Sequence, residues 1–307
     1  MTLTLDPTLF HDAAISDETR GFVARFEAEV AGLPAAQDQP PELTRKARDE
    51  GRGLFPLQGP DARSAWREIE GGRIRWSPST KAEAGAAQGT YLHIHGGGWT
   101  LGSPWHYDIR NCALAQGTGL NVAAVEYRLA PENPWPACFD DCLNAALWAA
   151  DQPGPLFIGG ESAGAHLTAL TALALRERGI EVAGLVLNYG CFDLDLTPSA
   201  ALWGARQLVL STPTITWFVE NMAMSADARR AASPLHADLS DLPPALFQVG
   251  TLDPLLDDTL MAARWVGAGN RADMAIYPGG IHAFDAFDTE ISRAYQAREI
   301  AFLKSLL

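Results

Sequence analysis

Apolar residues occur in short runs and in longer periodic segments that alternate along the chain from residue 65 onward. Short apolar runs predict strands, which we place at residues 90–95, 120–127, 156–159, 182–188, 245–249 and 273–277. Apolar residues at helical spacing predict helices at residues 136–149, 162–178, 254–267 and 291–306. Strands that alternate with helices need crossover connections, so the pattern predicts an α/β fold with a mostly parallel sheet.

A hairpin precedes this alternation. Residues 66–70 and 73–76 alternate apolar and polar side chains on either side of Gly71 and Gly72, a pattern typical of two antiparallel strands joined by a tight turn. We therefore expect an antiparallel pair at one edge of a mixed sheet.

Two regions carry a helical pattern outside the alternation. Residues 1–65 contain no strand signal and predict helices at 19–31 and 43–50, separated by prolines. Residues 190–232 interrupt the alternation and are too long for a plain loop. We predict that residues 66–189 and 233–307 form the α/β domain, and that residues 1–65 and 190–232 pack together as a helical cap.

The chain of 307 residues has a net charge of −14, which argues against nucleic acid or an anionic membrane as a partner. Its start lacks the basic and apolar regions of a signal peptide, and no apolar run is long enough to span a bilayer. The four cysteines, including Cys138 and Cys142 on one face of a predicted helix, fit no zinc-binding spacing. We expect buried thiols, no metal site and a location in the reducing cytoplasm.

The sequence Gly160-Glu161-Ser162-Ala163-Gly164 lies between a predicted strand and a predicted helix. This is the G-x-S-x-G pattern of a nucleophile elbow, in which small neighbours let the backbone turn sharply and leave the serine hydroxyl exposed above the sheet. The alternative is an ordinary glycine-rich turn. The strand before the motif and the helix after it favour Ser162 as a nucleophile.

A serine nucleophile needs a base, and the base needs an orienting carboxylate. In this kind of sheet the chain order is serine, acid, histidine, and the histidines after Ser162 are His166, His236 and His282. His166 lies one helical turn beyond Ser162 and is expected to be structural, and His236 leaves little chain before it for an acid. His282 follows the strand at 273–277, where the base is expected.

The orienting carboxylate should follow the strand at residues 245–249. Asp253 does so, and Asp257 is its rival one helical turn later. The alternative role of Asp253 is to cap the next helix, with Pro254 as the first helical residue.

Three consecutive glycines follow the strand at 90–95, in the segment His-Gly-Gly-Gly-Trp at residues 95–99. Glycines leave backbone N–H groups free to point at a bound oxygen, so we expect this loop to donate hydrogen bonds to the oxyanion of an acyl transfer. The N–H of Ala163, next to Ser162, is the expected remaining donor. The alternative is a flexible turn.

In chain order these motifs resemble the hormone-sensitive-lipase family of α/β-hydrolases, the bacterial group IV esterases. The matching segments are His-Gly-Gly-Gly at 95–98, Tyr-Arg-Leu-Ala-Pro-Glu at 127–132, Gly-Glu-Ser-Ala-Gly at 160–164, Ser-Pro-Leu at 233–235, Leu-Pro-Pro-Ala at 242–245, Asp-Pro-Leu at 253–255 and His282. The resemblance covers about residues 65–305 and implies an α/β-hydrolase fold, its central sheet flanked by helices, with a two-part cap. It implies these roles: nucleophile Ser162, base His282, acid Asp253, and oxyanion donors Gly97, Gly98 and Ala163.

The chain departs from the family pattern near the site. Glu161 stands where the family usually has Asp, and Ala165 and Ala283 stand where it usually has Gly. None of these departures removes a catalytic group, but together they leave the subfamily and the substrate preference open.

The resemblance implies a serine carboxylesterase that hydrolyses short- to medium-chain esters through an acyl-enzyme, without a metal or cofactor. Its partner is a small-molecule ester, and a homodimer that pairs the edge strand at 273–277 is implied by analogy. Side chains that are candidates for the substrate pocket, each with core packing as the alternative, are Trp99, Trp203, Trp217 and Phe218.

Other functions on the same fold are weaker interpretations. An arylformamidase-like amide hydrolase also carries His-Gly-Gly, but the segment at 127–132 favours the esterase. A non-catalytic ligand-binding receptor loses the catalytic histidine, whereas this chain keeps His282. A lipase acting on aggregated fat is disfavoured because no large apolar lid segment stands out.

Overall fold

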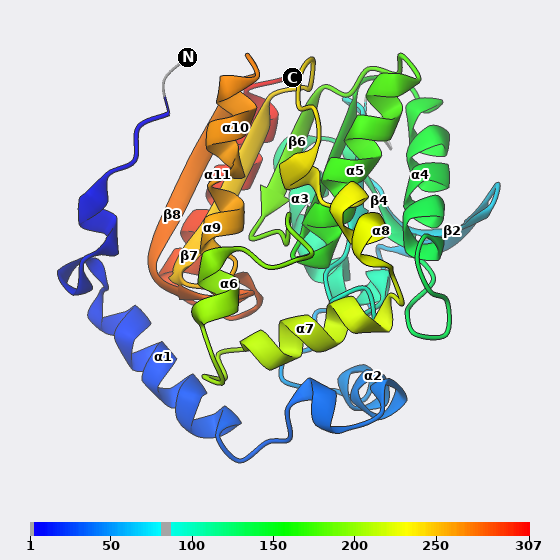
Figure 1. Ribbon diagram of the computed structural model, residues 1–307. Helices are drawn as coiled ribbons and strands as arrows, with labels where there is room; N and C mark the ends of the chain where they lie inside the picture. The colour runs from blue at the N-terminus through cyan, green and yellow to red at the C-terminus, as the bar shows by residue number, and fades with distance from the viewer. Residues whose placement is uncertain (1–2, 81–86) are drawn as a thin grey trace.

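The computed structural model describes residues 3–80 and 87–307 of the chain. Within these ranges an eight-stranded sheet forms the centre of the molecule, in the order β1-β2-β4-β3-β5-β6-β7-β8 (Figure 1). The strands are β1 (Ala65–Ile69), β2 (Gly72–Ser77), β3 (Thr90–Ile94), β4 (Asn121–Glu126), β5 (Leu156–Glu161), β6 (Gly184–Asn188), β7 (Ala245–Leu252) and β8 (Ala272–Ile281). All neighbouring strands in the part of the sheet β4-β3-β5-β6-β7-β8 are parallel. By contrast, β2 pairs antiparallel with both β1 and β4. The predicted α/β fold and the mixed edge are confirmed.

Helices cover both faces of the sheet (Figure 1). One face carries α4 (Ala137–Ala150), α5 (Ala163–Glu177) and α10 (Met261–Gly267), and the other carries α3 (Asp108–Thr118) and α11 (Glu290–Lys304). Side chains of β3 alternate between the two apolar layers that result. Leu92 and Ile94 belong to the layer with α4 and α5, whereas Tyr91 packs with Leu114 of α3 and Phe302 of α11.

Helices from two distant parts of the chain gather beside the sheet. They are α1 (Asp17–Val30), α2 (Pro41–Asp49), α6 (Pro198–Leu202), α7 (Thr212–Asn221) and α8 (Ala226–Ala231). Figure 1 shows α1, α2 and α7 along the same end of the molecule. The Thr214 hydroxyl of α7 donates to the Gln37 side-chain oxygen at 2.8 Å, and Arg206 pairs with Glu27 of α1 at 2.9 Å. These contacts support the proposal that residues 1–65 and 190–232 form one cap.

The helix α1 packs along the edge strand β8. Ser16 begins the helix by accepting a hydrogen bond from the Thr19 N–H, and acidic residues in the first turn favour the helix dipole. Its apolar side chains recur at helical spacing and are buried in a cluster with side chains of β8. The members from α1 are Val23, Phe26 and Val30, and those from β8 are Ile276, Tyr277 and Ile281.

Some elements differ from the sequence prediction. The sequence prediction did not include α3. The buried face of this helix carries Asp108, Arg110 and Asn111, and these polar side chains conceal the apolar period that indicates a helix. The helix predicted at 254–267 is divided at Leu260 into α9 (Leu256–Thr259) and α10. The strands β7 and β8 extend beyond their predicted ends because they continue to pair with each other.

No helix in the described ranges is both long and apolar enough to cross a membrane. The four cysteines are free and buried, as predicted. The same residues contain no group of three or more His, Cys, Asp or Glu side chains placed to hold a metal ion.

A buried carboxylate joins the start of the cap insertion to the α/β domain. Asp258 of α9 accepts hydrogen bonds from the N–H groups of Phe192 and Asp193, at 2.6 and 3.0 Å, and from the Thr197 hydroxyl. Burial raises the pKa of Asp258 from 3.8 to about 7, against the lowering effect of these donors. The folded protein therefore holds a proton that the unfolded chain releases between these two pH values.

Stability is expected to fall as the pH rises from about 4 to about 7, because the folded state binds more protons than the unfolded state in this window. Asp258→Asn removes this linkage and keeps a side chain that can still accept from both N–H groups. Relative to the wild type, the variant should gain about 2 kcal/mol of unfolding free energy between pH 5 and pH 7. Urea unfolding of both proteins at the two pH values measures the gain. The prediction fails if the difference in unfolding free energy between variant and wild type is the same at pH 5 and at pH 7.

Candidate active site

The turn between β5 and α5 holds Ser162 in a strained conformation. Its backbone has φ 56° and ψ −123°, a region that a residue with a side chain rarely occupies. The turn lies against the end of β3, and a Cβ atom at Gly160 or Gly164 would lie 2.3 or 1.9 Å from the Ile94 carbonyl oxygen. Only glycine fits at these two positions, so the close approach of β3 explains the glycines of the motif.

The Ser162 hydroxyl begins a chain of hydrogen bonds. His282 Nε2 lies 2.9 Å from Ser162 Oγ, and His282 Nδ1 lies 2.9 Å from Asp253 Oδ2. Each of the three residues directly follows the last residue of a strand, β5, β8 or β7, so the parallel sheet brings them together at one edge. In this arrangement a histidine can take a proton from the serine while the carboxylate orients the imidazole.

Asp253 contacts the histidine, whereas its alternative role as the cap of the next helix is wrong. Its Oδ1 accepts from the Leu255 N–H at 2.8 Å, while Oδ2 contacts His282. The helix α9 begins at Leu256, with Leu255 as its capping residue. Asp253 therefore orders the turn before the helix and contacts the histidine with the same carboxylate.

The rival base and acid lie elsewhere. His236 pairs with Asp193 at 3.2 Å, and Asp257 accepts from the Ser199 N–H at 2.8 Å. His166 is buried within α5. None of these hydrogen bonds involves Ser162 or His282.

The glycine loop after β3 turns its carbonyl groups towards its own residues. The Gly96 carbonyl accepts from His95 Nδ1 at 2.8 Å, and the Gly97 carbonyl accepts from the Leu101 N–H at 2.7 Å. Burial lowers the pKa of His95 to about 3, so this ring is neutral. In a trans peptide the C=O and N–H groups point in opposite directions, so the N–H groups of Gly97 and Gly98 point away from these partners.

Free amides are available beside the serine. No hydrogen bond within the described residues uses the N–H of Gly97 or Gly98. Ala163 is the first residue of α5, where a helix leaves its N–H groups without an internal partner. These three amides, all predicted as oxyanion donors, have no hydrogen-bond partner among the described residues.

Trp99 is a core residue. Its side chain is 2% exposed, and its indole N–H donates to His166 Nδ1 at 3.2 Å. His166 Nε2 in turn donates to the Ala232 carbonyl oxygen at 2.7 Å, and burial lowers the pKa of this ring to about 4. This packing favours the alternative interpretation of Trp99, that of a core residue, because the indole ties the loop to α5.

The other aromatic candidates lie in the cap. Phe218 of α7 covers the glycine loop, since a Cβ atom at Gly98 would lie 2.2 Å from its ring. Trp217 lies beside it, with 5.0 Å between the ring centroids. The Trp203 indole N–H donates to the Arg206 carbonyl oxygen at 2.9 Å, and its ring packs against the cluster that contains α1. Phe218 is thus adjacent to the loop, whereas Trp203 stabilises the cap.

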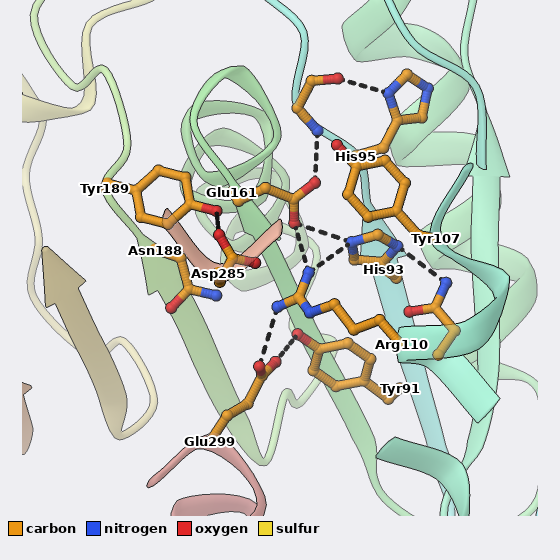
Figure 2. Close-up of polar contacts among 12 residues, drawn as sticks. Tyr91, His93, His95, Tyr107, Arg110, Glu161, Asn188, Tyr189, Asp285 and Glu299 are labelled. Carbon is orange, nitrogen blue, oxygen red and sulfur yellow. Dashed lines mark hydrogen bonds and ion pairs between the residues drawn. The ribbon is translucent and has the colours of Figure 1, made fainter. Parts of the chain in front are cut away.

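A buried polar network that includes Glu161, the residue before Ser162, was not predicted (Figure 2). Its members bond to one another through charged groups and hydroxyls, and they are Tyr91, His93, Arg110, Glu161, Tyr295 and Glu299. The signal in the sequence is the alternation Tyr91-x-His93 within a strand that is buried on both faces. Polar residues at every second position of such a strand indicate a polar layer on one face.

Tyr189 connects a second buried acid, Asp285, to the histidine. The Tyr189 ring meets the His282 ring edge to face, with 4.9 Å between centroids, and the Tyr189 hydroxyl donates to Asp285. Burial raises the pKa of the Asp285 carboxyl, which Figure 2 shows close to Glu161. Tyr189 therefore packs against the histidine ring while its hydroxyl is held by Asp285.

Residues 91–286 match the model of a family described by its alpha/beta hydrolase fold. The chain belongs to the α/β-hydrolase fold family. The match includes the glycine loop, Ser162, Asp253 and His282, and it covers most of the α/β domain of this hydrolase.

Individual relatives of this hydrolase are esterases. A carboxylesterase from Mycobacterium tuberculosis is 30% identical over 309 residues, which cover 93% of this chain and 92% of the relative. The structure of an esterase from the archaeon Pyrobaculum calidifontis superposes with a TM-score of 0.81 at 30% identity and covers 95% and 98% of the two chains. A hormone-sensitive lipase from a metagenome library gives 0.82 at 26% identity, with coverage of 94% and 98%. The hydrolase is therefore an esterase-type member of the hormone-sensitive-lipase family, which confirms the resemblance in its motifs.

Proposed function

We propose that this α/β-hydrolase is a serine carboxylesterase for short- to medium-chain esters, with Ser162 as nucleophile, His282 as base and Asp253 as orienting acid. The observation that carries the proposal is the hydrogen-bonded chain Ser162–His282–Asp253, with 2.9 Å at both contacts. The esterases among its relatives support ester chemistry.

In the proposed reaction Ser162 Oγ attacks the ester carbonyl carbon while His282 Nε2 takes the hydroxyl proton. The carbonyl oxygen becomes an oxyanion and accepts hydrogen bonds from the free amides of Gly97, Gly98 and Ala163. The intermediate collapses, the C–O bond to the alcohol breaks, and His282 protonates the leaving oxygen. Water then attacks the acyl carbon and gives a proton to His282. The bond from this carbon to Ser162 Oγ breaks, His282 protonates Oγ, and the carboxylic acid leaves.

The strain at Ser162 suits this role. A serine with φ 56° presents its hydroxyl above the turn, at the amino end of α5, where the helix dipole stabilises developing negative charge. The neighbouring Ala163 N–H belongs to the same turn, so nucleophile and oxyanion donor are fixed relative to each other by two adjacent residues.

The location and the oligomeric state of the protein remain proposals. The buried free thiols fit a reducing compartment such as the cytoplasm. A homodimer through the edge strand β8 stays a prediction, and size-exclusion chromatography with light scattering would test it.

Turnover of p-nitrophenyl acetate, butyrate, octanoate and palmitate tests the proposed function, with an aryl formamide as the competing substrate class. We expect the highest kcat/KM with acetate or butyrate and the lowest with palmitate. A folded protein that hydrolyses none of the esters, or that prefers the formamide, would refute the carboxylesterase.

Phe218→Ala should shift the same profile towards longer acyl chains. The ring lies over Gly98 and limits the space in front of the loop, so its removal should raise the ratio of octanoate to acetate kcat/KM by about tenfold. Trp217→Ala is the matched control, because this neighbouring ring is not the one against Gly98, and its ratio should change less. Equal ratios in all three proteins would exclude Phe218 from the acyl pocket.

A further inference from the structure

The Glu161 carboxylate connects β5, the strand that ends before Ser162, to the glycine loop at residues 95–98 (Figure 2). We call this segment the oxyanion loop. Glu161 directly precedes Ser162 and is 3% exposed. Its Oε1 accepts from the Gly96 N–H at 2.7 Å. Its Oε2 accepts from His93 Nε2 and from an Arg110 guanidinium N–H, each at 2.9 Å. All three partners donate to the carboxylate, and the Gly96 N–H among them belongs to the backbone of the oxyanion loop.

Arg110 bonds to a second carboxylate at the far end of the network (Figure 2). Its Nη2 donates to Glu299 at 2.9 Å and to the Tyr295 hydroxyl oxygen at 3.0 Å. The Tyr91 hydroxyl donates to Glu299 at 3.0 Å. The network therefore continues from α11 through α3 to β5. Within the described residues it reaches the backbone of the oxyanion loop through the bond from the Gly96 N–H to Glu161.

A buried ion network of this kind contributes little net stability, because desolvation offsets the attraction between its charges. Burial alone would raise the pKa of Glu161, but the charges of His93 and Arg110 and the bonds from His93 and Gly96 outweigh burial and hold this pKa well below its ordinary value. Glu161 is thus ionised at neutral pH and is a permanent acceptor for the Gly96 N–H.

The Gly96 contact determines where the following amides lie. Its N–H is bound by Glu161 and its carbonyl by His95, so both peptide planes at Gly96 are fixed. The loop also packs directly on the turn, since a Cβ atom at Gly96 would lie 2.9 Å from the Glu161 carbonyl oxygen. A displacement of reacting groups by about 1 Å can lower the rate by about 10²-fold, so such fixation matters for catalysis.

We propose that Glu161 is a positioning residue for the oxyanion hole, and that its carboxylate clamps Gly96 and thereby holds the amides of Gly97 and Gly98 next to Ser162. The proposal rests on the esterase function proposed above. Glu161 acts through the loop and exchanges no proton with the substrate.

Glu161→Gln breaks this clamp, because an amide has one acceptor oxygen where the carboxylate has two. The oxygen is expected to accept from Arg110 and His93 Nε2. The NH₂ group then faces the Gly96 N–H, so that two donors oppose each other. We expect kcat for p-nitrophenyl butyrate to fall about 10- to 100-fold. KM should change less than about threefold, because the lost interaction acts on the transition state.

Glu299→Gln is the matched control. It removes the same charge from the same buried network, but its amide can accept from Arg110 and donate to the Tyr91 hydroxyl oxygen. The Gly96 contact is untouched. This variant should lower the melting temperature, as Glu161→Gln does, and keep kcat within about threefold of the wild type.

Inhibition by 1,1,1-trifluoro-2-hexanone separates positioning from stability. Ser162 Oγ adds to the ketone carbon, the hydroxyl proton passes to His282, and the ketone oxygen becomes an oxyanion bound by the loop. Glu161→Gln should raise Ki by about the factor by which it lowers kcat, whereas Glu299→Gln should leave Ki unchanged. For each protein kcat is calculated per titrated active site, Ki is measured on the same sample, and the melting temperature is recorded.

Should Glu161→Gln not fold, Glu161→Asp carries the same test. It keeps the charge that Arg110 requires, but it is one methylene shorter and loses the 2.7 Å contact with Gly96, so Ki should rise at least about threefold. Folded Glu161 variants that bind the ketone as tightly as the wild type overturn the proposal. A wild-type protein without ester turnover refutes the esterase function instead, so the two failures are distinguishable.

Discussion

Ser162→Ala is expected to lower kcat for p-nitrophenyl butyrate by about 10⁴-fold or more. The variant lacks the hydroxyl that lies 2.9 Å from His282 Nε2, so no acyl-enzyme can form and only the oxyanion donors remain. The fold should persist, because the backbone N–H of residue 162 still donates to the Asn188 carbonyl at 2.9 Å. Release of p-nitrophenol and the melting temperature measure the two effects.

The control for this variant is Ser103→Ala, in the segment that follows the oxyanion loop. Ser103 precedes a short helix without a side-chain capping bond, so its hydroxyl has no part in the proposed reaction and activity should stay within about twofold. A Ser162→Ala protein that retains more than a tenth of the wild-type rate would remove Ser162 as the nucleophile.

Asp253→Asn is expected to lower kcat by on the order of 10⁴-fold without removing any group that touches the substrate. Oδ1 accepts from the Leu255 N–H, so the asparagine is expected to keep its oxygen there and turn its NH₂ towards His282 Nδ1. Nδ1 must then accept a hydrogen bond, which puts the ring proton on Nε2. An Nε2 that already carries a proton cannot take one from Ser162.

Asp257→Asn is the control for the acid, because Asp257 is the rival on sequence grounds. Its contact is with the Ser199 N–H at 2.8 Å, and an asparagine oxygen can accept the same bond, so kcat should remain within about threefold. A larger loss in Asp257→Asn than in Asp253→Asn would reverse the two roles. The pH dependence of kcat in both variants, compared with the wild type, shows whether the histidine still titrates as a base.

The arrangement around Ser162 could be predicted because its causes are local. Glycines at 160 and 164 are required where the turn meets the Ile94 carbonyl, and they are visible as a motif. The alternation of strands and helices places the residue after each parallel strand at one edge of the sheet. Asp253 and His282 could therefore be named from their position after β7 and β8.

The residues behind the nucleophile could not be predicted, because their partners are far apart in the sequence. Glu161 pairs with Arg110 of α3, and Arg110 pairs with Glu299 of α11, so these charges are balanced by residues far away in the sequence. Arg110 and its polar neighbours also weaken the apolar pattern of α3. The sequence therefore predicted neither this helix nor the role of Arg110. Trp99 was ambiguous for a related reason, since only its distant partner His166 shows that it packs in the core.

The packing of α1 on β8 has a consequence for how the chain matures. Val23, Phe26 and Val30 leave the ribosome long before residues 272–281, against which they are buried. At synthesis rates of about 5–20 residues per second, this apolar stripe waits roughly ten to fifty seconds for its partner. Docking of α1 is therefore a late step, and its apolar stripe is accessible to a chaperone for most of the time that the chain is being synthesised.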